Sequence, residues 1–343
     1  MPNAYISGTG LYVPPRVVTN DDLVRDFGIE TTHEWIVQRT GIEQRHFADD
    51  GVGTSDLALE ASKRAIESSG LALADIDMIL LCTLSPDQAF PGTGVYLQAK
   101  LGFGNLDPPK FVPAMDIRNQ CSAFLYGLST ANALVRSGAA KHVLLVGAET
   151  HSHALDLSTR GRQIAALFGD GAGAVIVSAT EEDRGIRGVW LGADGRYADV
   201  LSQKVWDVRR FPFIPQNAEG VGLVSPSMMW AQMDGKMVFK HGVEKMITAL
   251  MQACWARGLN ADDIDLFAFH QANLRMNQYI AEQLQIPASK LLHNIERFGN
   301  TTAATIPTLL AEAVSEGKLR PGMRVACVAF GSGFTWGSAI IEW

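Results

Sequence analysis

Two stretches of this 343-residue sequence follow one pattern. Residues 70–81 read GLALADIDMILL, and residues 258–269 read GLNADDIDLFAF. In each stretch a glycine ends a helical pattern, an aspartate-rich turn follows, and an apolar run typical of a buried strand comes next. Because self-similarity of this kind indicates a duplicated structural unit, we predict two equivalent halves, residues 1–178 and residues 179–343.

A second repeated pair surrounds two glycine-rich sequences. FGDGAG at residues 168–173 precedes a strand pattern at 174–177, and FGSG at 330–333 precedes one at 338–341. A dinucleotide-binding glycine motif opens a helix after a strand, whereas here a strand follows the glycines. We therefore exclude a nicotinamide-dependent dehydrogenase.

A third pair consists of two helical patterns, one in each half. The first starts at Cys121 and ends near Gly138, and the second starts at Asn300 and ends near Gly317. The first carries no charge before Arg136, and a helix that is apolar on every side belongs in a core. Strands buried on both faces that alternate with helices imply mixed or parallel sheets. We therefore predict an α/β fold of five layers, a duplicated αβαβα sandwich with these two helices at its centre.

Composition and cysteine spacing exclude several classes of protein. The chain is 47% hydrophobic and 19% charged, which is typical of a folded globular protein, and its charge of −7 argues against nucleic-acid binding. No apolar run is long enough to suggest a membrane span. The N-terminal residues lack the features of a secretory signal, so we expect a cytoplasmic protein. Four cysteines without metal-type spacing predict neither a metal site nor a disulfide framework, and they are Cys82, Cys121, Cys254 and Cys327.

Three polar residues lie where predicted strands give way to helices. Cys121 follows the apolar run 112–117, His270 follows 266–269, and Asn300 opens the second central helix. In α/β folds, ligands bind beyond the carboxyl ends of strands. A helix N-terminus stabilises a thiolate, so we expect Cys121 to have a lowered pKa and to be the nucleophile.

Each of these residues also has a purely structural interpretation. A single cysteine is commonly buried packing, a histidine at a strand end is often a hydrogen-bonded structural residue, and an asparagine at a helix start is usually an N-cap. The three positions nevertheless occupy equivalent strand-to-helix junctions of the repeat. That placement favours one shared site between the halves, with cysteine and histidine catalysis as its chemistry.

The chain resembles the β-ketoacyl-acyl-carrier-protein synthase III family of condensing enzymes, which have the thiolase fold. The resemblance covers nearly the whole length. It implies a homodimer that condenses an acyl-CoA primer with malonyl-acyl-carrier protein, with loss of carbon dioxide, in the first step of fatty acid synthesis; no cofactor or metal is implied. The motifs that carry it are EWIVQRTGI at 34–42, the region of Cys121, FGDGAGA at 168–174, HQANLR at 270–275, GNTTAA at 299–304 and FGSGFTWG at 330–337.

The resemblance also assigns roles to individual residues. Cys121 matches the nucleophile that carries the acyl group as a thioester. His270 and Asn300 match the pair that donates hydrogen bonds to the malonyl thioester carbonyl and stabilises the enolate. The backbone N–H groups of Cys121 and Ser332 match the oxyanion hole for acyl transfer.

The same resemblance places the substrates around this centre. Trp35 and two arginines match the residues that hold the adenine and phosphate end of CoA, where an aromatic ring beside a guanidinium suits a nucleotide. Taken alone, Trp35 is also readily explained as a partly buried surface aromatic. Arg275 matches a contact for the carrier protein, and we expect Arg209, Arg210 and Lys240 to join it in a local positive patch for this acidic partner. Phe90 matches a residue that closes the partner's acyl pocket across the dimer. The CoA and tunnel residues are Thr31, Trp35, Arg39, Arg162, Gly235, Phe239, Ala272 and Asn273.

The chain departs from the family pattern in three places. The residues around the nucleophile read RNQCSAF at 118–124, Ser332 stands where the family has the middle glycine of three, and the segment 196–232 is unusually long. These departures leave the primer's length and branching open, and also whether the acceptor is a carrier protein or CoA. They permit one alternative, an acyltransferase or long-chain condensing enzyme of specialised metabolism. A thiolase is disfavoured because FGSG lacks a second cysteine, and an inactive partner subunit would normally lack one of the three polar residues.

Residues 196–232 have no counterpart in the first half, so we interpret them as an insertion. Prolines stiffen a loop, and methionine and aromatic side chains adapt to apolar ligands. We expect this segment to wall or cover the acyl and CoA channel and to admit a primer longer than acetyl; a surface arm that stabilises the dimer is the alternative. The side chains concerned are Trp206, Phe211, Pro212, Phe213, Ile214, Pro215, Pro226, Met228, Met229 and Trp230.

Overall fold

Two five-stranded sheets form the frame of the protein in a computed structural model. The structure describes residues 1–205, 208–209, 216–217, 219, 222, 228 and 230–343. Residues 1–180 supply the first sheet and residues 185–342 the second. The chain crosses from one to the other between the end of β7 and the start of β8, and we propose the predicted division at 178/179 as the boundary of the two halves.

The first sheet has the strand order β1-β7-β6-β4-β5. β4 runs parallel to β5 and β6, whereas β7 is antiparallel to both β6 and β1, so the sheet is mixed as expected. The elements of this half are β1 (Asn3–Tyr12), β2 (Arg16–Thr19), α1 (Asn20–Arg25), α2 (His33–Thr40), β3 (Gln44–Phe47), α3 (Thr54–Ser69), β4 (Met78–Cys82), α4 (Thr93–Leu101), β5 (Ala114–Ile117), α5 (Ala123–Arg136), β6 (His142–Glu149), α6 (Arg162–Ala165) and β7 (Gly171–Thr180).

The second sheet has the order β12-β11-β13-β14-β8 and repeats the mixture of parallel and antiparallel pairs. Its helices include α8, whose last buried residue, Cys254, lies on the face toward the sheet. The elements of this half are β8 (Gly185–Ala193), β9 (Leu201–Ser202), β10 (Gln232–Met233), α8 (Gly235–Trp255), β11 (Leu266–Phe269), α9 (Leu274–Gln283), β12 (Leu291–Leu292), α10 (Ile295–Phe298), α11 (Thr305–Ser315), β13 (Arg324–Gly331) and β14 (Thr335–Glu342).

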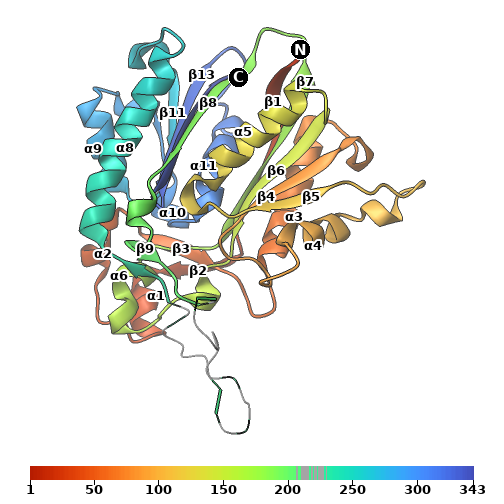
Figure 1. Cartoon of the computed structure of the whole chain (residues 1–343). Helices are drawn as coiled ribbons and strands as arrows, with labels where there is room; N and C mark the ends of the chain where they lie inside the picture. The colour runs from red at the N-terminus through yellow and green to blue at the C-terminus, as the bar shows by residue number, and fades with distance from the viewer. Residues whose placement is uncertain (206–207, 210–215, 218, 220–221, 223–227, 229) are drawn as a thin grey trace.

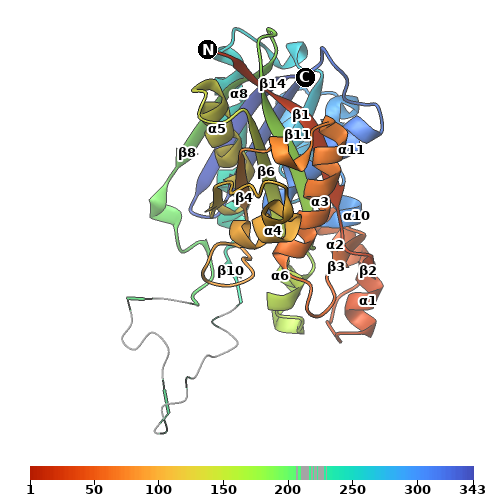
Figure 2. The ribbon, with the colours of Figure 1, turned by 90° about the vertical axis from the view of Figure 1, so that its right-hand side faces the viewer.

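The layers follow the predicted order of helix, sheet, helices, sheet and helix. α5 and α11 lie between the sheets and each contacts strands of both (Figure 1). α8 and α9 cover the outer face of the second sheet (Figure 1), and α3 and α4 cover the outer face of the first (Figure 2). The thiolase-like sandwich is therefore confirmed, with the two apolar helices at its centre.

The central layer is packed closely enough to require glycine in the strands beside it. A Cβ added at Gly147 of β6 would lie 2.3 Å from the carbonyl oxygen of Ala303, and one added at Gly173 of β7 would lie 2.6 Å from the amide nitrogen of Thr308. Neither approach is possible for a residue with a side chain, so these glycines bring the start of α11 directly against the first sheet. Gly171 begins β7, which confirms that FGDGAG leads into a strand.

A smaller unit of β2, β3, α1, α2 and α6 lies at one end of the sandwich, as Figure 1 shows. It has an apolar core of its own that includes Ile36 and reaches Leu274 of α9. The fully buried guanidinium of Arg45 donates to the carbonyl oxygen of Ala166 at 2.7 Å and to Asn20 Oδ1 at 2.8 Å. These bonds tie the small unit to the segment that precedes FGDG.

The two ends of the insertion are joined at its base. β9 and β10 pair antiparallel, with Ser202 opposite Gln232. Near this base the guanidinium carbon of Arg160 lies 3.9 Å from the ring centroid of Trp230. Most of the side chains on which the predicted cover depends lie outside the described residues, as does Arg210 of the predicted basic patch: Trp206, Phe211, Pro212, Phe213, Ile214, Pro215, Pro226 and Met229.

Candidate functional site

Cys121 lies in a short 3-10 turn, Gln120–Ser122, directly before α5. Gln120 has a φ of 48°, an unusual left-handed value for a residue other than glycine, and it turns the chain sharply into the cysteine. A Cβ added at Gly331 would lie 2.9 Å from Cys121 Cβ, so the end of β13 passes directly over the nucleophile. The backbone N–H groups of Cys121 and Ser332 lie close enough to the sulfur to lower the pKa of the thiol.

The expectation of a lowered thiol pKa is wrong. Burial raises the pKa of Cys121 to about 12, and the negative charge of Glu149 adds to that rise. The N–H groups of Cys121 and Ser332 lower the pKa, but their effect is smaller than the cost of placing a thiolate in a site with 9% exposure. The resting residue is therefore a thiol. All four cysteines are free and buried, and Cys82 and Cys327 lie within strands as predicted.

Asn300 lies two residues before a second 3-10 turn, Thr302–Ala304, which leads into α11. Its Oδ1 accepts a hydrogen bond from the backbone N–H of Thr302 at 2.9 Å, which leaves the NH2 group free to donate. This turn contacts the turn of Cys121, so the repeat brings its two junctions together. The backbone of Asn300 is also bridged to Phe168, the first residue of FGDG.

His270 follows β11 and is almost completely buried. Its Nδ1 lies 2.7 Å from Thr305 Oγ1, and its Nε2 is buried and has no partner within the part of the chain that the structure describes. Burial lowers the pKa of the imidazole to about 3, so the ring is neutral at physiological pH. Nδ1 of this neutral ring is hydrogen-bonded to Thr305, and Nε2 is available for a hydrogen bond with a substrate.

Trp35, Arg39 and Arg162 meet at the end of α2. The guanidinium carbons of Arg39 and Arg162 lie 4.3 Å and 5.1 Å from the Trp35 ring centroid. Arg162 is anchored by a bond from Nη1 to the carbonyl oxygen of Glu30 at 2.9 Å. An indole flanked by two guanidinium groups provides both a stacking surface and positive charge.

The comparisons with known proteins agree with this geometry. Residues 115–195 match the model of "3-Oxoacyl-[acyl-carrier-protein (ACP)] synthase III", and residues 254–343 match that of its C-terminal part. The β-ketoacyl-[acyl-carrier-protein] synthase III of Clostridium perfringens is 40% identical and covers 100% of both chains. That of Roseiflexus sp. strain RS-1 is 39% identical over 99% of this chain and 98% of its own.

Solved structures extend the likeness to the whole fold. The synthase III of Thermus thermophilus superposes with a TM-score of 0.87 at 38% identity and covers 99% of each chain. That of Aquifex aeolicus has a TM-score of 0.86 at 35% identity, covering 99% of this chain and 100% of that one. The chain belongs to the 3-oxoacyl-[acyl-carrier-protein] synthase III family.

As a synthase III, the protein is an acyltransferase, an ACP-dependent condensing enzyme that initiates fatty acid synthesis. The resemblance inferred from the motifs is thus confirmed. The alternative of specialised metabolism is not favoured, because the relatives given above, at 39–40% identity, carry the synthase III name.

Two of the residues assigned to substrate contacts in this synthase III are already engaged with α2. Asn273 caps α9, because its Oδ1 accepts from the N–H of Arg275, and its Nδ2 donates to the carbonyl oxygen of Arg39 at 3.0 Å. Arg275 is exposed, and its guanidinium donates to the carbonyl oxygens of Gln38 and Val37 at 3.2 Å and 2.9 Å. Both side chains therefore hold the C-terminal end of the helix that carries Trp35.

The other residues assigned to the pantetheine path lie in α8 or just before α9 and α2. Phe239 of α8 is 40% exposed, and its ring centroid is 6.4 Å from that of Tyr279. Gly235 begins α8, Ala272 precedes α9, and the hydroxyl of Thr31 is buried without a partner among the described residues. Each of these positions leaves surface or a polar group available to a ligand.

Sequence reasoning missed four polar residues behind the site: Glu149, His151, Thr302 and Thr305. All are buried, and each contacts the catalytic candidates or their neighbours. GNTTAA was noted only as a motif, and nothing in the spacing of Glu149 or His151 indicates that β6 ends beside Cys121. The positive φ of Thr302, 48°, is visible only in the structure.

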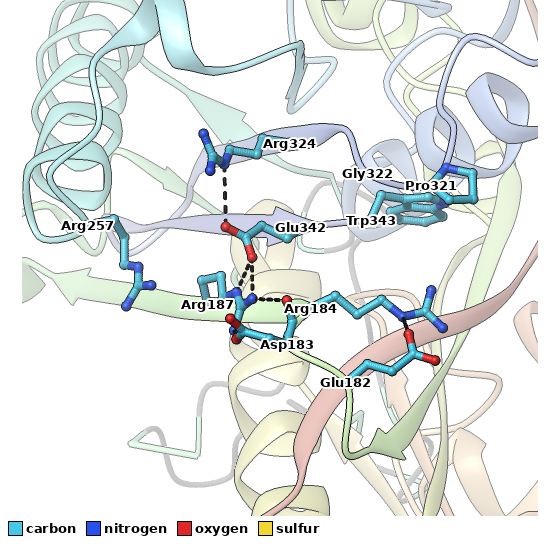
Figure 3. A pocket seen from close by; sticks show the side chains of 10 residues that line it. All are labelled: Glu182, Asp183, Arg184, Arg187, Arg257, Pro321, Gly322, Arg324, Glu342 and Trp343. Carbon is cyan, nitrogen blue, oxygen red and sulfur yellow. Dashed lines mark hydrogen bonds and ion pairs between the residues drawn. The ribbon is translucent and has the colours of Figure 1, made fainter.

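A cavity of about 570 Å³ lies at the opposite end of β13 and β14 from the site (Figure 3). It is lined by arginines and carboxylates that pair with each other, as Arg187 and Arg324 do with Glu342. Because three of its four arginines are paired with carboxylates and it lies far from the end of β13 that passes Cys121, we assign it no part in the chemistry. Within the described ranges, His, Cys, Asp and Glu form no cluster able to hold a metal ion, and no helix is long and apolar enough to cross a membrane.

Proposed function

We propose that this synthase III uses Cys121, His270 and Asn300 to join an acyl-CoA primer to malonyl-acyl-carrier protein. The observation that carries the proposal is the meeting of two sets of hydrogen-bond donors at one buried site. The N–H groups of Cys121 and Ser332 lie near the sulfur, Asn300 precedes the turn that contacts the turn of Cys121, and His270 is held against the start of α11 through Thr305. Donors fixed in a dry site stabilise developing negative charge strongly.

In the first half-reaction, Cys121 attacks the thioester carbonyl of acyl-CoA. A bond forms between Sγ and the carbonyl carbon, and the bond to the CoA sulfur breaks. The thiol proton passes to the departing CoA thiolate, so the products are an acyl-cysteine thioester and CoA thiol. Because burial raises the pKa of Cys121 to about 12, the thiol loses its proton only as the bond to the carbonyl carbon forms, and the N–H groups of Cys121 and Ser332 stabilise the negative charge of that step.

In the second half-reaction, malonyl-carrier protein loses carbon dioxide and becomes an enolate. His270 and Asn300 donate hydrogen bonds to its thioester oxygen, which holds the negative charge. The enolate carbon then attacks the acyl carbonyl, whose oxygen lies in the hole formed by the N–H groups of Cys121 and Ser332. The Cys121 thiolate leaves and regains a proton, which yields the 3-oxoacyl-carrier protein.

The substrates enter past Trp35 in this proposal. The indole with Arg39 and Arg162 suits the adenine and phosphates of CoA, and Thr31, Gly235, Phe239, Ala272 and Asn273 line the path of the pantetheine chain. Arg275 and Lys240 lie on exposed faces of α9 and α8, where they offer positive charge to an acidic carrier protein. Since Arg275 also supports α2, an Arg275→Glu substitution is expected to weaken both CoA binding and salt-sensitive carrier binding.

We propose a homodimer formed through the open edge of β5. β5 is an outer strand of the first sheet, and Met115 on it is 42% exposed. Phe90 and Phe111 in the neighbouring loops are each 84% exposed. An apolar, unpaired sheet edge favours pairing with a second copy, which would bring Phe90 to the partner's acyl pocket. We further propose a cytoplasmic enzyme without a resident cofactor.

Intact mass after incubation with a panel of acyl-CoAs tests the proposal. We expect one acyl group per chain on the natural protein, with the accepted chain lengths defining the primer. Malonyl-carrier protein added to the acylated enzyme should remove the acyl group and release carbon dioxide. An enzyme that stays unmodified by every acyl-CoA, or keeps its acyl group with malonyl-carrier protein, would contradict the proposed chemistry.

A further inference from the structure

Thr302 is the residue that links the two polar side chains of the condensing site. Its φ of 48° lies in the left-handed region, which is strained for a residue branched at Cβ. Its side chain is fully buried, so surrounding contacts must hold the strained turn. Strained backbone that persists in a buried position beside a site points to a functional constraint.

Each polar atom of Thr302 has a partner. Its N–H donates to Asn300 Oδ1 at 2.9 Å, and its carbonyl oxygen accepts from the backbone N–H of Thr305 and lies 3.0 Å from Thr305 Oγ1. Its own hydroxyl lies 2.7 Å from His151 Nε2. One residue thus contacts Asn300 directly and reaches His270 through Thr305, with a second buried histidine behind it.

The contact with Asn300 determines which way the amide points. Because Oδ1 is held by the Thr302 N–H, the NH2 group is the part left to face a substrate. A thioester or enolate oxygen can only accept hydrogen bonds, so this orientation is the one that stabilises it. The reversed amide would place an acceptor against the enolate.

The contact with Thr305 determines the tautomer of His270. Thr305 has one hydroxyl proton and two acceptors, His270 Nδ1 at 2.7 Å and the Thr302 carbonyl at 3.0 Å. If the proton goes to Nδ1, the ring proton must be on Nε2, which then donates. If it goes to Thr302, Nδ1 holds the ring proton and Nε2 is a bare acceptor. The first arrangement is favoured, because Nδ1 is the nearer acceptor and the Thr302 carbonyl oxygen already accepts the backbone N–H of Thr305.

His151 keeps Thr302 in place from behind. It is buried, and its ring centroid lies 4.7 Å from that of Phe168. The segment after Phe168 is joined to Asn300, because the Gly169 N–H donates to the carbonyl oxygen of Asn300 at 3.2 Å. His151 is thereby enclosed between the FGDG segment and the strained turn.

We propose that Thr302 and Thr305 are positioning residues of the condensing site: Thr302 orients the amide of Asn300, and Thr305 holds His270 with its proton on Nε2. His151 stabilises Thr302 in this arrangement. The inference rests on the proposed roles of His270 and Asn300 in stabilising the enolate. It adds the groups that make both of them donors: the backbone N–H of Thr302 for Asn300 and the hydroxyl of Thr305 for His270.

Thr305→Val tests the tautomer, because it removes the hydroxyl and keeps the branched shape. We expect malonyl decarboxylation to fall toward the roughly 10²–10³-fold loss caused by removing one donor, while acylation of Cys121 falls far less. Thr305→Ser should restore decarboxylation. Thr308→Val is the matched control, since Thr308 is equally buried in α11 but donates only to the carbonyl oxygen of Thr305.

Nitrogen-15 NMR of histidine-labelled enzyme reads the tautomer directly, with His270→Ala identifying the signal. The proposal expects a proton on Nε2 in the natural protein and in Thr305→Ser, and a shift of population to Nδ1 in Thr305→Val. A proton on Nδ1 in the natural protein, or full decarboxylation by a folded Thr305→Val, would overturn it. If His270→Ala itself keeps decarboxylation, the proposed function fails instead.

A double-mutant cycle tests the part played by His151. His151→Phe and Thr302→Gly remove the same hydrogen bond from its two sides, and glycine adopts the positive φ without strain. We expect each single variant to lower the rate of decarboxylation. The rate of the double variant should be no lower than that of the more impaired single variant. Fully additive losses would show that His151 acts on something other than Thr302.

Discussion

The two central strand-to-helix junctions of this enzyme present their functional groups in opposite ways. At the Cys121 junction the donors belong to the main chain, the N–H groups of Cys121 and Ser332. At the Asn300 junction the donors are side chains, and threonines orient them. The first arrangement depends on close backbone approach at Gly331, and the second depends on a buried polar network. In the proposed function, one duplicated frame thus supports a nucleophile at one junction and an enolate site at the other.

Main-chain and side-chain hydrogen-bond donors respond differently to amino-acid substitution. Main-chain donors survive any side-chain change that preserves the backbone, so only Cys121 itself is indispensable at the first junction. Side-chain donors disappear when they are truncated, and their supports can be removed separately. Substitutions at the two junctions should therefore affect different half-reactions.

The largest effect is expected from Cys121→Ala. Because the nucleophile is lost and the backbone is kept, covalent acylation should be abolished while the unfolding temperature stays close to that of the natural protein. Intact mass after acyl-CoA treatment measures the first, and thermal unfolding the second. Continued acylation would place the nucleophile at Cys82, Cys254 or Cys327.

The next effect comes from His270→Ala and Asn300→Ala. Each removes one donor of the enolate site, so malonyl decarboxylation should fall by about 10²–10³-fold, far more than acyl transfer from CoA. Carbon dioxide release and acyl mass measure the two steps separately. Equal loss of both steps would assign these residues a structural or general-base role and remove the distinction between the junctions.

A smaller effect is expected from the buried carboxyl group behind the nucleophile. Burial raises the pKa of Glu149 to about 7, and its charge raises the pKa of Cys121. Above pH 7 the carboxylate is ionised, so Glu149→Gln should speed thiol alkylation there by lowering the Cys121 pKa. At pH 5 the carboxyl is protonated and the two proteins should react alike. Alkylation rates of the natural protein and of Glu149→Gln, measured from pH 5 to 9, check this. The same ratio between the two proteins at pH 5 and at pH 9 would contradict the explanation.

The smallest effect is expected from Ser332→Gly. The variant keeps the N–H that faces Cys121 and loses only the hydroxyl bond from Ser332 Oγ to the carbonyl oxygen of Leu201 in β9. Since one neutral hydrogen bond contributes about 0.5–1.5 kcal/mol, a slight fall in unfolding temperature with little change in acylation is expected. A large loss of acylation would mean that the side chain, and not the main chain, positions this junction.

The sequence predicted correctly those elements whose structure follows from a local pattern of apolar residues. The apolar runs placed β4, β6, β11 and β13, and the uncharged helix after Cys121 proved central. It failed for the pKa of Cys121, because a helix N-terminus is visible in a sequence but the degree of burial is not. The same applies to Arg275, whose charge was evident but whose bonds to the end of α2 were not.

The sequence by itself determined the duplicated frame, the family and the candidate trio, since periodicity, glycine placement and local motifs act along the chain. Only the tertiary structure decided how those residues are held: Glu149 beside the nucleophile, His151 behind Thr302, and Thr305 on His270. These contacts join positions as far apart as 151 and 302. Which group donates and which accepts depends on the groups that are buried together. Burial and hydrogen-bond partnership arise from packing between the halves, and neither is a property of any single stretch of sequence.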